Sequence, residues 1–349
     1  MANIRDVAEL AGVSPSTVSM VLNNHAQERK ISPATQRIVL DAASALHYVP
    51  KRPPRHIYLA DNSITLCIYV EMDHSANFLL RMINGLRTQM AEMEMELNTL
   101  ISPFVKNRLS EKLVLQNNHT MQAAIIAAPY VRDIEYLENN RIGIPFVLYN
   151  RSSKTCNTVE IDNFAVGQQA ADHLMERRVK TAGIISAMPG YAAIRTRSRG
   201  FEETCALKGI EILPKFRLST DNSERGGYET GERIAAMSDR PRALFCDSDA
   251  IAMGLVSALV RQGVRVPQEI GVVCVGMGDP KSISYMNPSL TTVDIPHEEM
   301  SAKSVQLLMK IIQREIVETS HIMCESRLLI RETSPTLEVS SFSGSKPAL

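Results

Sequence analysis

Apolar runs and amphipathic stretches alternate along residues 63–333, and this alternation restricts the fold more than any other feature of the sequence. Runs of strand length occupy residues 64–70, 123–129, 144–150, 181–187, 242–248 and 270–276. Helical periodicity lies between them, notably at residues 78–95, 164–177, 195–208, 249–261 and 297–314. Strands that alternate with helices are typical of parallel α/β sheets. Two successive sets of such units, with turn-rich crossings near residues 162–163, 288–293 and 320–325, predict an α/β body in two parts.

The N-terminal residues carry a different pattern, that of three short helices at residues 4–10, 14–23 and 32–46. Ser14 and Ser32, each followed by proline, suit the N-cap positions of the second and third helices. Ala8, Gly12 and Val18 have the spacing of a helix-turn-helix. Ala8 is small enough for the helices to touch, and Gly12 accepts a positive φ at the turn. Val18 is expected to pack from the second helix into the core.

If this turn forms, the second helix enters the major groove of DNA and its first residues face the base edges. Hydroxyl groups there can contact bases or phosphates, apolar side chains can contact a thymine methyl, and amides at helix starts suit phosphates. The predicted DNA-contacting residues of the head are Ser14, Pro15, Ser16, Thr17, Ser19, Met20 and Asn23. On this pattern alone, a protein-binding three-helix bundle stays open as the alternative.

Composition and charge describe a globular protein with a basic N-terminus. The 349 residues suffice for two or three domains, and 44% hydrophobic with 22% charged residues argues against a disordered chain. The net charge of zero divides into +3 for residues 1–58 and −3 for the remainder, which points to a nucleic-acid-facing N-terminus. No leader segment and no apolar run of membrane-spanning length is found, so we expect a cytoplasmic protein without membrane contact.

Motifs for catalysis, metals and cofactors are missing from the sequence. No Gly-x-Ser-x-Gly, His-Glu-x-x-His or Walker motif occurs, and the segment 276–278 lacks the third glycine of a dinucleotide-binding fingerprint. The six cysteines are scattered without metal-ligand spacing. We therefore expect no enzymatic activity, no cofactor and no metal site.

The segment from Ile4 to Asn23, IRDVAELAGVSPSTVSMVLN, closely resembles the head of the lactose-repressor (LacI/GalR) family of bacterial regulators. It contains the family's D-V-A, A-G-V-S, T-V-S and N elements, and the likeness continues to about residue 333. This resemblance implies an effector domain of periplasmic-binding-protein architecture, whose two lobes close around a small ligand. The expected domains are a helix-turn-helix head at 1–49, a hinge at 50–62, an effector-binding and dimerisation domain at 63–333 and a flexible tail at 334–349.

The function that the resemblance implies is sequence-specific transcriptional regulation, with the protein acting as a repressor controlled by a small polar metabolite, a sugar or sugar derivative. A homodimer on near-palindromic operator DNA is expected, because one small head buries too little surface to be selective. The tail has no heptad pattern and gives no support for a tetramer. A ligand-sensing protein that acts mainly through protein partners is the alternative function.

The hinge departs from the family pattern. In the family this stretch folds to a short helix on operator DNA and inserts an apolar side chain into the minor groove. Ile57 stands where the family usually has the inserted leucine, and Arg52 and Arg55 suit an electronegative groove. The consecutive prolines 53 and 54 are tolerable only in the first turn of a helix, so a flexible basic linker stays open as the alternative.

The resemblance also implies a set of effector-binding residues. Arg197 falls where the family has its ligand-binding arginine, and a guanidinium there can bind paired hydroxyls or a carbonyl. Asn150 ends a strand where the family commonly has an aspartate, and Phe78 is a candidate apolar wall. Ser248 and Asp249 match the family's N-D helix opening, although Asp249 can instead cap the helix.

Gly278 is the departure with the largest expected consequence for the ligand. It occupies the position of the aspartate that usually grips the ligand, while its neighbour Asp279 is retained. The loss of a carboxylate near Arg197 makes the local potential more positive. We therefore expect better tolerance of a carboxylate or phosphate on the ligand than is usual for the family, unless Asp249 or Asp279 points inward and restores the acceptor.

Overall fold

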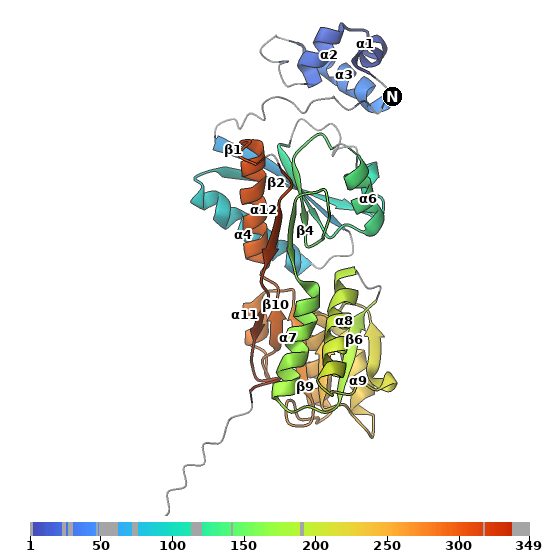
Figure 1. Ribbon diagram of the computed structural model, residues 1–349, viewed down its shortest axis with the longest axis vertical. Coiled ribbons are helices and arrows are strands. Elements are labelled where there is room, and N and C mark those ends of the chain that lie inside the picture. The colour runs from blue at the N-terminus through green and yellow to red at the C-terminus, as the bar shows by residue number, and fades with distance from the viewer. Residues whose placement is uncertain are drawn as a thin grey trace, which may run out of the picture. The chain divides into compact units, whose positions relative to one another are not determined.

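A computed structural model describes residues 3–22, 26, 31–46, 48, 62–71, 76–112, 121–140, 142–188, 192–316 and 318–336 (Figure 1). The chain divides into two compact units, one of residues 1–160 and 297–324 and the other of residues 161–296 and 325–349. The chain crosses from one unit to the other three times, and two of these crossings lie close to the predicted ones near 162–163 and 320–325. The third follows Pro296 and not residues 288–293, because part of that segment forms a strand.

The head of the first unit consists of α1 Ile4–Ala11, α2 Pro15–Leu22 and α3 Pro33–Ala45. Gly12 ends α1 with a φ of 64°, the left-handed conformation that the predicted turn requires. Ala8 and Val18 are buried in the core that the three helices share. The predicted helix-turn-helix is therefore confirmed as a fold.

The rest of the first unit is built on a six-stranded sheet with the order β11-β5-β4-β3-β1-β2. Its strands are β1 Ser63–Glu71, β2 Glu96–Phe104, β3 Ala123–Ala127, β4 Phe146–Tyr149, β5 Thr158–Ile161 and β11 His321–Cys324. Neighbouring strands from β2 to β5 pair in parallel. The helices of this part are α4 Ala76–Glu92, α6 Val131–Asn139 and α12 His297–Ile312, with a short η2 at Leu109–Glu111.

The second unit repeats this architecture with the strand order β12-β10-β9-β8-β6-β7. Its strands are β6 Ala182–Ala187, β7 Arg217–Thr220, β8 Ala243–Cys246, β9 Gly271–Gly276, β10 Thr291–Asp294 and β12 Arg327–Leu329. Neighbouring strands of this sheet pair in parallel, except that β10 and β12 are antiparallel. The helices are α7 Asn163–Glu176, α8 Ala192–Leu207, α9 Glu224–Ala235, α10 Asp249–Arg261 and α11 Pro280–Ser284, with a short η3 at Pro214–Phe216. The two parallel-dominated sheets confirm the predicted α/β class.

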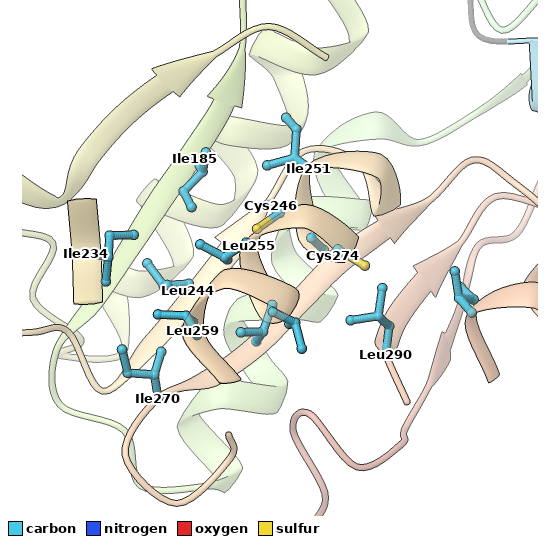
Figure 2. Packing of buried hydrophobic residues seen from close by; sticks show 14 of the residues in the cluster. Ile185, Ile234, Leu244, Cys246, Ile251, Leu255, Leu259, Ile270, Cys274 and Leu290 are labelled. Atoms are coloured by element: carbon cyan, nitrogen blue, oxygen red, sulfur yellow. The ribbon is translucent and has the colours of Figure 1, made fainter. Parts of the chain in front are cut away.

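Buried strands and one face of α10 form an apolar core in the second unit. Figure 2 shows Ile185 and Leu244 from the sheet together with Ile251, Leu255 and Leu259 from α10. Because both faces of a parallel sheet are covered, its central strands are continuous apolar runs, which made them visible in the sequence. This core fixes the carboxyl ends of β6, β8 and β9, where ligands of open α/β sheets bind.

Glycines allow close approach within two helix pairs of the second unit. A Cβ at Gly167 of α7 would lie 2.0 Å from the carbonyl oxygen of Arg197 in α8. A Cβ at Gly254 of α10 would lie 1.8 Å from the carbonyl oxygen of Glu224 in α9. The position of Arg197 on α8 is therefore set by backbone contact with α7, not by long side chains that can adapt.

Candidate functional site

Helix α2 presents its first residues to solvent. Pro15 and Ser16 are exposed, whereas Val18 lies in the core of the head. The Ser14 hydroxyl accepts a hydrogen bond from the Thr17 backbone N–H at 3.1 Å, so Ser14 caps this helix as the sequence predicted. The same hydroxyl lies 2.7 Å from the Ser16 hydroxyl. Hydrogen bonds among its own side chains therefore hold the start of α2 in place, and its exposed first residues are available to contact the major groove of DNA.

The remaining DNA-contacting predictions divide between described and undescribed parts of the chain. Ser19 and Met20 are partly exposed on α2, one turn after Ser16. Asn23, Arg52, Arg55 and Ile57 lie outside the described residues, so their roles stay predictions.

An aromatic cluster surrounds Phe78 in the first unit. Phe78 near the start of α4 is buried and meets the His297 ring edge to face, with ring centroids 5.0 Å apart. The Tyr149 hydroxyl at the end of β4 lies 2.9 Å from His297 Nδ1 and donates to the His297 carbonyl oxygen at 3.2 Å. Burial raises the pKa of Tyr149 well above its usual value, so the phenol stays protonated. Phe78 therefore packs in a rigid group that includes two polar rings.

Asn150 follows this cluster at the end of β4. It is buried and has a φ of 54°, a left-handed conformation that asparagine tolerates better than most residues. Its backbone N–H donates to the Val159 carbonyl oxygen at 2.8 Å, and its own carbonyl oxygen accepts from Arg151 Nη1 at 2.6 Å. The backbone at Asn150 is thus fixed on both sides, which sets the place from which its amide projects.

Arg197 lies in the second unit, in the second turn of α8. Arg197 is only 2% exposed, and its Nε donates a hydrogen bond to the Asn163 side-chain oxygen at 2.9 Å. Its Nη1 lies 3.7 Å from the Met277 sulfur, which follows β9. The guanidinium is therefore held at the carboxyl ends of the strands, which is where a ligand-binding arginine is expected.

Ser248 and Asp249 have different tasks at the start of α10. The Ser248 hydroxyl accepts from the Ile251 N–H at 3.3 Å and is the N-cap, so the proposed capping by Asp249 is wrong. Asp249 Oδ2 instead accepts from the backbone N–H groups of Met277 at 3.0 Å and Gly278 at 2.7 Å. Asp249 thereby ties α10 to the loop after β9 and fixes the backbone at Gly278, which is itself buried.

Asp247 is the residue of this site that the sequence analysis missed. It follows β8 directly and is 1% exposed. Its carboxylate accepts from the Ala187 N–H and from the Ser198 hydroxyl, each at 3.2 Å. Burial raises its pKa to about 6, an effect that the Arg197 charge partly offsets. The available signal was an acidic residue set directly after an apolar strand, where burial is expected and a charge is costly.

Two family descriptions match the chain. Residues 3–51 match the bacterial regulatory proteins, lacI family, and residues 171–334 match the periplasmic binding protein-like domain. A solved structure described as a LacI family transcription regulator from Clostridium acetobutylicum is 32% identical, has a TM-score of 0.74 and covers 77% of this chain and 99% of its own. The chain belongs to the LacI family.

Other members of the LacI family match along nearly the whole chain. The HTH-type transcriptional repressor PurR of Pasteurella multocida is 27% identical over 339 residues, which is 95% of this chain and 98% of that protein. A structure described as a transcriptional regulator CelR–cellobiose complex is 24% identical, with a TM-score of 0.67 over 95% of this chain and 100% of its own, and shares the fold. This LacI-family protein is a DNA-binding transcription regulator, and its family is one of regulators and not of enzymes.

None of the described helices has the length and hydropathy needed to cross a bilayer. Within the same residues, no group of three or more histidine, cysteine or acidic side chains is arranged to hold a metal ion.

The raised pKa of Asp247 predicts a pH dependence of stability. Because the folded chain holds this proton more tightly than the unfolded chain, the contribution of Asp247 is fully present below about pH 4 and is lost as the pH rises through 6. Relative to Asp247→Asn, the wild-type free energy of unfolding should fall by about 2 kcal/mol between pH 4 and pH 7. Urea titrations at both pH values measure this difference.

Asp279→Asn is the control for this experiment. Hydrogen bonds from the Lys281 backbone N–H and the Ser282 hydroxyl lower the pKa of Asp279, so its contribution is lost as the pH falls, opposite in sign to Asp247. If the free energy of unfolding changed with pH in the same way for wild type and Asp247→Asn, the raised pKa of Asp247 would be contradicted.

Proposed function

We propose that this LacI-family protein is a homodimeric repressor that acts in the cytoplasm, binds near-palindromic operator DNA and is controlled by a small polar metabolite, a sugar or sugar derivative. The observation that carries the DNA-binding part is the helix-turn-helix of the head, with the first residues of α2 exposed. The names of the relatives support repression and small-ligand control, since PurR is a transcriptional repressor and CelR is in complex with cellobiose. Dimerisation follows from the small surface of one head.

Within this function, the domain boundaries predicted from the sequence assign operator binding to residues 1–49 and the hinge at 50–62. Effector binding and dimerisation are assigned to residues 63–333, and 334–349 form a tail. We place Arg197 in direct contact with the effector, and we propose that Asp249 acts through the loop that it fixes at Gly278. Phe78, Asn150 and Ser248 complete the proposed effector-binding set.

Variants of the head test the assignment of roles on DNA. An operator is first selected from a random duplex pool with the full chain. Ser16→Ala and Met20→Ala should each change the preference at one base position, by about tenfold to a hundredfold. Arg55→Ala should weaken binding to all duplexes alike. It should also reduce the slope of log affinity against log salt concentration by about the amount that one phosphate contact contributes. Fluorescence anisotropy over a salt series measures both quantities.

Arg5→Ala is a matched control for Arg55→Ala, since it removes the same charge from an exposed position on α1. The assignment would be contradicted by a change in base preference for Arg55→Ala with an unchanged salt slope. It would also be contradicted if Ser16→Ala and Met20→Ala both kept the wild-type preference.

A further inference from the structure

Residues 331–334, here called the terminal segment, are held at the amino ends of β9 and β10. The Thr333 carbonyl oxygen accepts from the Val272 N–H, and the Thr333 hydroxyl donates to the Val272 carbonyl oxygen, each at 2.8 Å. The Thr333 N–H donates to the Ser289 carbonyl oxygen at 2.9 Å. Thr333 and Ser334 are both fully buried. Because β8, β9 and β10 pair in parallel, this contact lies at the end of the sheet opposite to the candidate effector site.

Two basic side chains from the end of α7 converge on Ser334. His173 Nε2 lies 2.7 Å from the Ser334 carbonyl oxygen and 3.0 Å from the Ser334 hydroxyl, and Arg177 Nη1 donates to the same hydroxyl at 2.8 Å. A carbonyl oxygen only accepts hydrogen bonds, so the proton of the neutral imidazole is on Nε2. Nδ1 is therefore the atom that would take up a second proton. His173 is 1% exposed, so this proton would enter a buried place.

The surroundings of His173 favour its neutral form. Among the described residues, neither His173 Nδ1 nor Arg177 Nε has a hydrogen-bond partner, so a proton on Nδ1 would find no acceptor there. Burial lowers the pKa of His173, and the positive charge of Arg177 lowers it further. The hydrogen bond to Ser334 and the charge of exposed Glu176 oppose this lowering only in part.

The other ionisable groups on the elements packed around His173 are paired or neutral. On α8, Lys208 is paired with Asp172 of α7 at 3.5 Å. In the terminal segment, Arg331 and Glu332 form hydrogen bonds with the backbone just before β10, each at 2.8 Å. The thiols of α8 and β9 stay neutral because burial raises their pKa; these are Cys205 and Cys274.

We propose that His173 is an acid-sensitive clamp, which holds the terminal segment against β9 and β10 while it is neutral and releases the segment when it is protonated. In the opened segment the imidazole is in water and takes up its proton at the ordinary pKa of 6.5. The open form therefore binds the proton more tightly than the clamped form. The contribution of the clamp is fully present above about pH 6.5 and is lost as the pH falls.

Hydrogen exchange of the full-length chain, measured by mass spectrometry on peptides that contain residues 331–334, tests this inference. The observed rates are divided by the intrinsic rate at each pH, so that the remaining change reports opening of the segment. Between pH 7.5 and pH 5.5, we expect the protection of the terminal segment to fall by about tenfold, because protonation of a water-exposed histidine stabilises the open form by that factor.

His173→Gln is the matched variant, because the glutamine amide can donate to the Ser334 carbonyl oxygen but takes up no proton. Its terminal segment should keep its protection within twofold between the two pH values. His321→Gln removes an exposed histidine of the first unit and should retain the wild-type fall. The proposal is overturned if the wild-type protection is the same at both pH values, or if His173→Gln shows an equal fall.

NMR of the wild-type chain with ¹⁵N-labelled histidine tests the clamp even if His173→Gln does not fold. The His173 ring should have its proton on Nε2 at pH 7.5 and should become doubly protonated at a lower pH than the histidines of the urea-unfolded chain. Protonation of His173 at the same pH as in the unfolded chain, or a proton on Nδ1 at pH 7.5, would overturn the proposal.

Discussion

Arg197→Ala is expected to abolish the ligand response while leaving operator binding by the head intact. The guanidinium is buried beside Asp247 and is held by Asn163, so truncation removes the main donor and leaves the carboxylate without its countercharge. Loss of a hydrogen bond from a charged donor costs about 1.5–3 kcal/mol, which corresponds to a loss in ligand affinity of about tenfold to a hundredfold. Calorimetry with the tightest-binding sugar and anisotropy with a selected operator measure the two activities separately.

Arg199→Ala is the control, because it removes the same charge from the same helix at an exposed position. Arg199 is paired only loosely with Glu203, at 3.6 Å, and its side chain is 65% exposed. We expect this variant to keep both activities within about threefold, since exposed ion pairs contribute little. A ligand affinity for Arg197→Ala within threefold of wild type would contradict the placement of Arg197 in the effector site.

Gly254→Ala is expected to produce the largest loss of stability from a single added methyl group. The new Cβ would lie 1.8 Å from the Glu224 carbonyl oxygen and 2.6 Å from the Tyr228 nitrogen, both backbone atoms of α9. Because neither atom can move without shifting the helix, α9 and α10 must separate. Overpacking of this kind costs about 3 kcal/mol, and denaturant unfolding with the m-value checked for two-state behaviour measures it.

The matched control for this glycine is Ser257→Ala, on the exposed face of the same helix. Its free energy of unfolding should stay within about 0.5 kcal/mol of wild type. If Gly254→Ala were as stable as Ser257→Ala, the close approach of α9 and α10 would be wrong.

Burial explains which strands the sequence predicted. The central strands β1, β3, β8 and β9 are buried along most or all of their length and were found as continuous apolar runs. Strand β2 was missed because it lies at a sheet edge and most of its residues are partly or fully exposed. Strand β10 was also missed, because its sequence TTVD is polar although three of its four residues are buried. Hydrophobicity alone detects burial only where the buried residues are apolar.

The candidate site was predicted less completely than the fold. The sequence placed Arg197 and Ser248 at strand ends, and the structure puts both there, but a linear pattern cannot tell which carboxylate faces which donor. Asp249 accepts hydrogen bonds from the backbone of the next loop, whereas Asp247 accepts them from the Ala187 N–H and the Ser198 hydroxyl. These choices depend on the spatial neighbours β6, β8 and β9, which are more than 20 residues apart in sequence. The position of α2 could be predicted without such information, because its turn, its cap and its apolar spacing are all local in sequence.

The most direct test of the account is the affinity of the full-length chain for its selected near-palindromic duplex compared with a shuffled duplex of the same composition. Both are measured by fluorescence anisotropy at one fixed salt concentration, because phosphate contacts alone bind any sequence. A sequence-specific regulator should prefer the selected duplex by about a thousandfold or more, and the tightest-binding sugar should change that affinity. Equal affinity for the two duplexes would contradict the account and favour a ligand sensor that acts through protein partners.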